Sequence, residues 1–242
     1  MTDITARQGF LLHLDSSADA AEDSVTRQLT AGFVTHWRAR HGESGYRYRD
    51  LAADPVPPLS PAYATLGRRV ERQGVIPMDR VDRLVRDQAE ERQWSLTRPL
   101  IDELRGAHTV LLGVPMYNFT VPATLKSWID RVSFPGAFTD PDSGRSVLEG
   151  TRVVAVVARG GGYGPGTPRE PYDFQVPYLR AYFGNLGVAE ENLHFVKAEL
   201  TRAGDIPALA RFQDLAKQSL AAAHADLTAL AAPAAAVRAG GL

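Results

Sequence analysis

Cysteine is absent from the 242-residue sequence. Without a thiol, the chain can form no disulfide, thiolate metal site or cysteine nucleophile. The sequence also lacks a signal-peptide pattern and any apolar run of about 18 residues, so we expect a cytoplasmic protein that does not span a membrane. The formal net charge is only −1, which offers no basic surface to nucleic acid or to an anionic membrane. Small molecules are therefore the expected partners.

Motifs for several common reactions are missing as well. The sequence contains no Gly-x-x-x-x-Gly-Lys-Ser/Thr phosphate loop, no Gly-x-Gly-x-x-Gly and no Gly-x-Ser-x-Gly nucleophile motif. These absences argue against P-loop nucleotide hydrolysis and against serine hydrolase chemistry. The 6 histidines form neither a His-Glu-x-x-His motif nor an i, i+4 pair. We therefore expect no metal site.

Five segments carry the apolar or alternating pattern of short strands, with turn residues around them. They cover residues 9–14, 46–51, 109–114, 152–158 and 192–197. Segments with helical spacing of apolar residues separate them. The expected helices are one from Asp23 or Ser24 through Trp37, two or three between 63 and 105, and one each over 122–131, 172–186 and 207–230.

Strands that alternate with helices predict an α/β fold with a doubly wound parallel sheet. Five strands favour the flavodoxin-like arrangement, with helices on both faces, over the six-stranded dinucleotide fold. The alternating aromatics of 46–51 favour an edge position for that strand. We expect a single domain over 1–230 with a helical insertion at about 63–98, followed by a frayed C-terminal tail over 231–242.

Three loops are predicted at the carboxyl edge of this sheet, namely 15–26, 115–119 and 158–164. In a flavodoxin-like fold, loops at this edge enclose flavin mononucleotide (FMN). The first loop offers the hydroxyls of Ser16, Ser17, Ser24 and Thr26 beside a helix N-terminus, which suits a phosphate. The alternative is that Ser24 is only a helix cap and that Ser16 and Ser17 are ordinary turn residues.

The other two loops suit a flavin ring. Met116, Tyr117, Asn118 and Phe119 combine apolar cover with donors and acceptors for the pyrimidine edge. The glycines in 160–162 would let backbone N–H groups approach the ring closely. The alternatives are a turn whose aromatics belong to the core and a flexible glycine-rich lid.

Several motifs together resemble a known family. The run Val114-Pro115-Met116-Tyr117-Asn118-Phe119, followed by Thr124-Leu125-Lys126, is similar to the flavin-binding signature of FMN-dependent NADH-azoreductases, which are relatives of the NAD(P)H:quinone oxidoreductases. The similarity extends over roughly residues 9 to 225. Further segments that resemble family positions, in order, are 50–57, 159–161, 176–179, Phe183-Gly184 and 186–188.

The resemblance implies a homodimer with FMN at the subunit interface. It also implies a phosphate loop (Ser17 and 24–26), a ring loop (116–119) and a pyrimidine-side loop (158–161). It implies no dedicated catalytic acid or base. Substrate-side candidates are Phe138, Tyr163 and Asn185. The cofactor-binding residues so implied are Ser17, Ser24, Val25, Thr26, Pro115, Met116, Tyr117, Asn118, Phe119, Ala158, Arg159, Gly160 and Gly161.

The implied function is ping-pong transfer of hydride from NADH or NADPH, through FMN, to quinones, azo compounds or related aromatics. Two alternatives stay open: a specialised flavin reductase of one aromatic metabolite, and a non-enzymatic flavin-binding protein. The second is motivated by the acidic first loop, where Asp15, Asp19, Glu22 and Asp23 have only Arg27 as a nearby cation. Carboxylates near a phosphate are repulsive unless they turn to solvent, so this loop predicts reduced FMN affinity.

Overall fold

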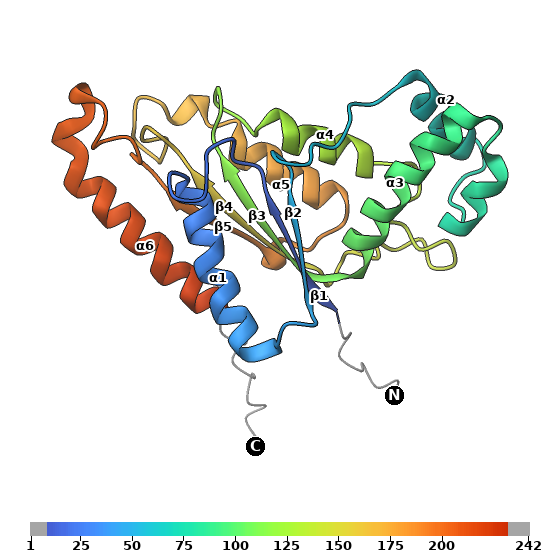
Figure 1. The fold of residues 1–242 in the computed structure, drawn as a ribbon, viewed down its shortest axis with the longest axis horizontal. Helices are drawn as coiled ribbons and strands as arrows, with labels where there is room; N and C mark the ends of the chain where they lie inside the picture. The colour runs from blue at the N-terminus through green and yellow to red at the C-terminus, as the bar shows by residue number, and fades with distance from the viewer. Residues whose placement is uncertain (1–8, 232–242) are drawn as a thin grey trace, which may run out of the picture.

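The computed structural model describes residues 9–231, and a five-stranded parallel sheet lies at its centre (Figure 1). The strand order is β2-β1-β3-β4-β5, with every neighbouring pair parallel. This is the flavodoxin-like order, so the predicted fold is confirmed. The strands are β1 Phe10–Asp15, β2 Tyr46–Asp50, β3 Ala107–Pro115, β4 Arg152–Ala158 and β5 Leu193–Ala198.

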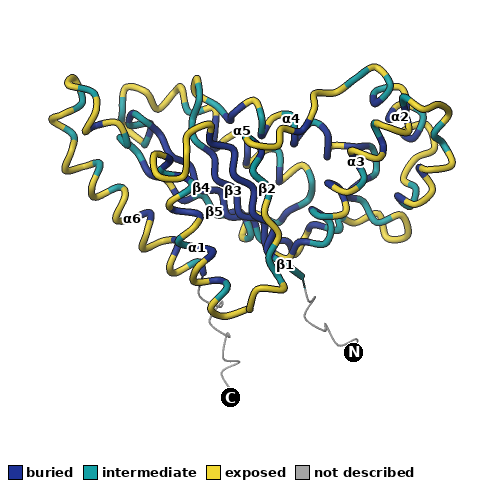
Figure 2. Tube along the Cα trace, in the orientation of Figure 1, coloured by how far each residue is buried: buried dark blue, intermediate teal, exposed yellow. Residues whose placement is uncertain are grey.

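Burial along the strands follows their place in the sheet. Strands β3 and β4 are central and almost continuously buried, because helices cover both of their faces (Figure 2). Strand β2 pairs only with β1, and its tyrosines and arginines stay partly exposed. The predicted edge position of this segment is confirmed.

Helices pack on both faces of the sheet (Figure 1). Helices α1 (Val25–His41) and α6 (Gln213–Ala231) lie side by side on one face. Helices α3 (Gln88–Gly106), α4 (Ala123–Val132) and α5 (Gln175–Asn185) cover the other. Each face therefore has its own apolar core, separated from the other by the sheet.

A smaller helical lobe precedes α3. It contains α2 (Pro61–Glu71), whose N-cap is Ser60, and the 3₁₀ helix η1 (Met78–Leu84). The lobe packs against α3 beyond the end of the sheet, on the right of Figure 1. Helix α3 itself leads straight into β3, so it serves as the crossover between β2 and β3. The frayed tail is predicted for 231–242, but Ala231 is the last residue of α6, and 232–242 lie outside the described residues.

Two predicted helices begin later than the sequence suggested. The segment Glu170–Tyr172 forms a separate 3₁₀ turn, η2, and α5 starts at Gln175, where the Asp173 carboxylate accepts from the Gln175 N–H at 3.1 Å. At the C-terminal end, the 3₁₀ helix η4 (Pro207–Phe212) precedes α6. In both places a proline opens a short 3₁₀ segment before the α-helix begins.

Gly113 in β3 makes room for a buried carboxylate of the neighbouring strand. A Cβ at this position would lie 2.2 Å from Asp15 Oδ1 and 3.4 Å from Thr30 Cγ2. The carboxylate has little freedom to move, because the hydroxyls of Thr30 and Tyr48 each donate to it at 3.2 Å. The close approach of β1 and its first loop to β3 thus requires glycine here.

We expect Gly113→Ala to lower the free energy of unfolding by about 1–3 kcal/mol, because the added methyl group must displace Asp15 from its donors. Gly32→Ala in α1 is the matched control, since nothing lies within 4 Å of its Cβ position. Alanine in a helix should raise stability there by about 0.5–1 kcal/mol. Urea denaturation measures both changes. Equal stability of Gly113→Ala and the unmodified protein would show that Asp15 is not confined.

Candidate functional site

Two adjoining cavities lie at the carboxyl edge of the sheet. The larger holds about 830 Å³ and the smaller about 210 Å³. Their combined size suits a cofactor with a planar ring and a polar tail. The smaller cavity is lined by Ser17, Ser24, Val25, Thr26, Pro115 and Ala158, the larger by Asn118, Phe119, Gly161 and Tyr163, and both by Met116, Tyr117 and Gly160.

The smaller cavity presents hydroxyls beside the N-terminus of α1. Ser24 is the N-cap, and its Oγ lies 3.4 Å from the Arg27 N–H that it accepts from and 3.1 Å from Thr26 Oγ1. The Ser17 hydroxyl is buried and accepts a long bond, 3.3 Å, from the Asp19 N–H. Ser16 instead donates to the Gly113 carbonyl at 2.7 Å. Ser24 is therefore a cap that also lines the cavity, whereas Ser16 only holds the loop to β3.

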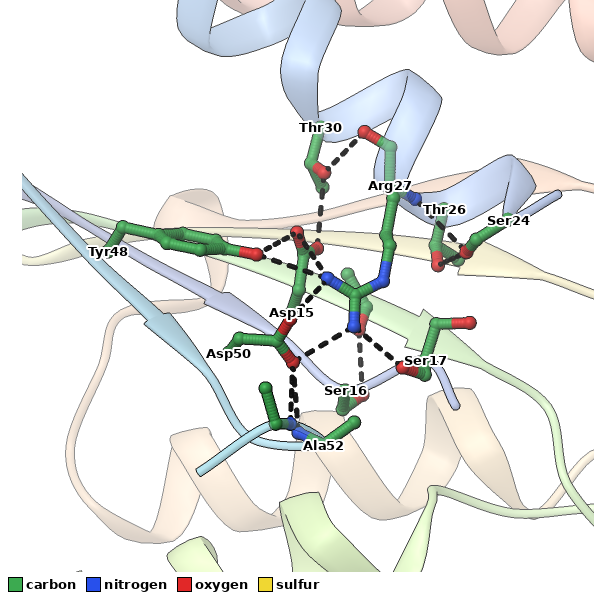
Figure 3. Close-up of polar contacts among 12 residues, drawn as sticks. Asp15, Ser16, Ser17, Ser24, Thr26, Arg27, Thr30, Tyr48, Asp50 and Ala52 are labelled. Atoms are coloured by element: carbon green, nitrogen blue, oxygen red, sulfur yellow. Dashed lines mark hydrogen bonds and ion pairs between the residues drawn. The ribbon is translucent and has the colours of Figure 1, made fainter. Parts of the chain in front are cut away.

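A partly buried polar network lies beneath this loop (Figure 3). The Arg27 guanidinium donates two bonds to Asp50, at 2.7 and 2.9 Å, and a third to the Ser17 carbonyl at 2.8 Å. Asp15 accepts from Tyr48 and lies 3.9 Å from Arg27. In the sequence, Arg27 is the one cation near the acidic first loop. In the fold, its guanidinium binds carboxylates and the loop backbone.

The same network determines where the acidic charge of the loop lies. Asp15 is buried and faces Tyr48 and Arg27, while Asp19 and Asp23 are exposed at the cavity edge. Burial, with the nearby carboxylates, raises the pKa of Tyr48 well above its usual range. Tyr48 therefore stays protonated and donates to Asp15 at neutral pH.

The ring loop is a tight turn with an unusual backbone. Tyr117 and Thr120 exchange two backbone hydrogen bonds, at 3.1 and 3.2 Å, around Asn118 and Phe119. Both central residues have positive φ, 48° and 75° respectively. Such a conformation is ordinary for asparagine and costs an aromatic residue roughly 1–2 kcal/mol. The hydrogen-bonded turn places Phe119 at the cavity with 43% of its surface exposed, so Phe119 is not a core residue.

The loop after β4 is held by defined hydrogen bonds rather than free to act as a lid. The Leu200 N–H donates to the Gly161 carbonyl at 3.2 Å, and the Thr201 N–H donates to the Arg159 carbonyl at 3.0 Å. The Glu199 carboxylate accepts from the N–H of Tyr163, also at 3.2 Å. The segment after β5 therefore fixes residues 160–162, the glycine strip, beside the cavities.

The Arg159 side chain lies below this strip and lines neither cavity. It is 0% exposed, and its guanidinium donates to Asp173 at 2.8 and 2.9 Å and to Glu199 at 3.0 Å. Its Nε donates to the Gln175 side-chain oxygen, and Gln175 in turn donates to the Val114 carbonyl at 3.0 Å. Arg159 thus joins the ends of β3, β4 and β5 to the start of α5.

A family model described as Flavodoxin-like fold matches residues 11–222. The chain belongs to the flavodoxin-like fold family. The chain is 41% identical over 200 residues to a Nocardia farcinica protein named FMN-dependent NADH:quinone oxidoreductase, covering 83% of this chain and 87% of that protein. A Frankia alni protein of the same name is 38% identical, with 92% and 98% covered. The resemblance predicted from the motifs is confirmed.

Solved structures share the architecture of this flavodoxin-like protein. An azoreductase from Bacillus anthracis superposes with a TM-score of 0.73 at 19% identity, covering 92% of this chain and 98% of that one. At this level of identity the likeness shows the fold alone.

Two predicted substrate-side residues of the flavodoxin-like protein lie away from the cavities. Phe138 belongs to the connection between α4 and β4, and its side chain is buried in the core. Asn185 is the last residue of α5. Both connections lead into the starts of parallel strands, so both residues sit at the amino edge. Tyr163, by contrast, lines the larger cavity, with its ring 6.4 Å from that of Phe119.

The sequence pointed to three loops around the site and missed a fourth, which follows β5. Arg202 and Thr201, in the loop after β5, line the smaller cavity together with the first loop. A usable signal was present, since a fifth parallel strand beside β4 must also end at the carboxyl edge.

In residues 9–231 there is no group of three or more histidine, aspartate or glutamate side chains arranged to hold a metal ion. None of the helices in that range is both long and apolar enough to cross a membrane.

Asp50→Asn tests the network beneath the first loop. Hydrogen bonds from Arg27, with those from the N–H groups of Ala53 and Ala52, lower the pKa of Asp50. The folded-state pKa therefore lies below the unfolded value of about 3.9. The ionised carboxylate stabilises the fold above that value, and this stabilisation is lost as the pH falls through the folded-state pKa.

We expect Asp50→Asn to be about 1–3 kcal/mol less stable than the unmodified protein at neutral pH. The difference should shrink as the pH falls below about 4, where the unfolded carboxyl takes up a proton, and should disappear below the lower folded-state pKa. Denaturant unfolding at a series of pH values measures it. Asp54→Asn, which changes an exposed carboxylate in the next turn, is the control. A difference that is the same at every pH would contradict the ion-pair account.

Asn118→Gly separates the ring-loop amide from its backbone conformation. Glycine accepts the positive φ without strain, so the thermal midpoint should stay unchanged or rise. Loss of the amide should weaken FMN binding about 3- to 10-fold, the effect of one neutral hydrogen bond. Asn118→Ala is the comparator, because it loses the same amide and also introduces a residue that adopts positive φ less readily than asparagine or glycine. Unchanged FMN affinity in Asn118→Gly, by flavin fluorescence titration, would remove this residue from the ring contact.

Proposed function

We propose that this flavodoxin-like protein binds FMN and transfers hydride from NADH to quinones, azo compounds or related aromatics. The observation that carries the proposal is the pair of adjoining cavities, one lined by hydroxyls and one by aromatic and glycine residues. The names of relatives at 41% and 38% identity support the same activity.

The residues present fit each part of FMN. The hydroxyls of Ser17, Ser24 and Thr26 and the N-terminus of α1 suit a phosphate. The larger cavity has a volume and an aromatic lining that suit a planar ring. Gly160 and Gly161 present backbone to the larger cavity, and a backbone N–H suits a ring carbonyl.

FMN bound in this site would supply reversible hydride chemistry, which no side chain of the chain offers. The protein's share is positioning. Tyr117 accepts from the Ala18 N–H at 3.1 Å, so it ties the phosphate loop to the ring loop. The rings of Phe119 and Tyr163 form a wall against which a planar substrate can stack. We propose that reductant and acceptor use the larger cavity in turn, which gives ping-pong kinetics.

We also propose that a second copy of the chain covers the rim of this cavity. Three aromatic side chains on the rim, Phe119, Tyr172 and Phe174, are 43%, 51% and 55% exposed. The Phe174 N–H donates to the Phe119 carbonyl at 3.2 Å, which holds the rim together. A contiguous exposed aromatic surface beside a ligand cavity is typical of a subunit interface.

Anaerobic reduction of the FMN-loaded protein tests the activity. We expect NADH to bleach the flavin absorbance and a quinone or azo dye, added afterwards, to restore it. Parallel-line kinetics against both substrates would show the ping-pong order. A purified protein that is colourless and takes up no added FMN would contradict the proposal. Light scattering on the same sample tests the dimer, and a mass that stays at 26.3 kDa would contradict that part.

A further inference from the structure

The loop after β5 places one arginine between the two cavities. Arg202 lines both of them, from the wall opposite the first loop. Its carbonyl accepts from the N–H groups of Asp205 and Ile206, at 3.2 and 3.0 Å, so a turn holds its backbone. Its guanidinium forms no hydrogen bond or ion pair within residues 9–231. The side chain is exposed, so its charge is open to a ligand in either cavity and is not paired with a carboxylate of the described residues.

The stem of Arg202 lies across the glycine strip. A Cβ on Gly160 would lie 3.2 Å from Arg202 Cδ and 3.3 Å from Cγ. These distances are shorter than ordinary contact, so a larger residue at 160 would push the stem away. Gly160 has an ordinary backbone conformation, since its φ is not positive. The absence of a side chain here serves the approach of the arginine as well as any ligand.

The charges that line the smaller cavity indicate what this arginine can bind. Asp19, Asp23 and Asp205 line that cavity, and Arg202 is the one cation among its described lining residues. Arg27 is close by but is engaged by Asp50. A phosphate dianion among these carboxylates is repelled, unless a positive group lines the same cavity.

We propose that Arg202 is the phosphate-binding cation of this site and holds the phosphomonoester of the flavin nucleotide. The inference rests on the proposed function, because it assigns a residue to the cofactor named there. Arg202 complements the hydroxyls of Ser17, Ser24 and Thr26 from the opposite wall. A guanidinium binds a phosphate through two parallel N–H donors, and its charge offsets that of the acidic loop.

Riboflavin, which has the same ring and no phosphate, provides the matched ligand. Apoprotein is titrated with FMN and with riboflavin, and quenching of flavin fluorescence reports each Kd. We expect Arg202→Gln to weaken FMN binding about 10- to 100-fold, the effect of losing a charge-assisted contact. Riboflavin binding should change less than about 2-fold, because the ring contacts remain. Arg202→Lys keeps the charge but loses the two parallel N–H donors. Its FMN affinity should therefore lie between that of Arg202→Gln and that of the unmodified protein.

Arg211→Gln is the control for net charge. Arg211 lies on η4 over the ring of Phe212, with its guanidinium carbon 4.7 Å from the ring centroid, and lines neither cavity. The FMN affinity of Arg211→Gln should equal that of the unmodified protein. Added salt should also weaken FMN binding less in Arg202→Gln than in the unmodified protein.

The outcomes separate this inference from the function on which it rests. Unchanged FMN affinity in Arg202→Gln would overturn the assignment and leave the proposed activity standing. An equal loss of FMN and riboflavin affinity would also overturn it, since the arginine would then act by packing on Gly160. An unmodified protein that binds neither flavin would overturn both proposals. Circular dichroism of each variant confirms that it is folded.

Discussion

The parallel pairing of β1, β3, β4 and β5 is the constraint on which every feature of the site depends. Parallel strands all end at one edge, so four loops that are far apart in sequence meet there. The Met116 N–H donates to the Ala158 carbonyl at 2.8 Å, which continues the β3–β4 ladder into the loops. The cavities are thus bounded by extensions of the sheet, and their walls share its rigidity.

Two arginines stabilise the loops at this edge, one on each side of β3. Arg27 joins β2 to the first loop through Asp50 and the Ser17 carbonyl. Arg159 joins β4 to α5 and to the loop after β5 through Asp173 and Glu199. Such partly buried pairs cost desolvation, and their gain lies in fixing one arrangement of the loops. The positions of the cavity-lining hydroxyls and N–H groups follow from that arrangement.

The acidic first loop shows how the meaning of a residue depends on its surroundings. Along the sequence, Asp15, Asp19 and Asp23 form a cluster that argues against an anion site. In the fold, Asp15 is buried against Tyr48 and Arg27, whereas Asp19 and Asp23 are exposed to water, which screens their charge. Arg202 then faces the loop from a segment almost 180 residues further along the chain. Whether FMN affinity is reduced, as the sequence predicts, depends on that balance.

The sequence by itself determined the five strands, their order of appearance, the edge position of β2 and the ring loop Pro115 to Phe119. These features depend on local patterns. Apolar runs, helical spacing and turn residues indicate whether a segment forms a strand, a helix or a turn, whatever core it packs against. Tertiary structure alone decided that Arg159 is buried, that Phe138 and Asn185 lie at the amino edge, and that Arg202 reaches the site. The direction of a long side chain depends on which carboxylates and cavities the packed elements bring near it, and no local pattern encodes that proximity.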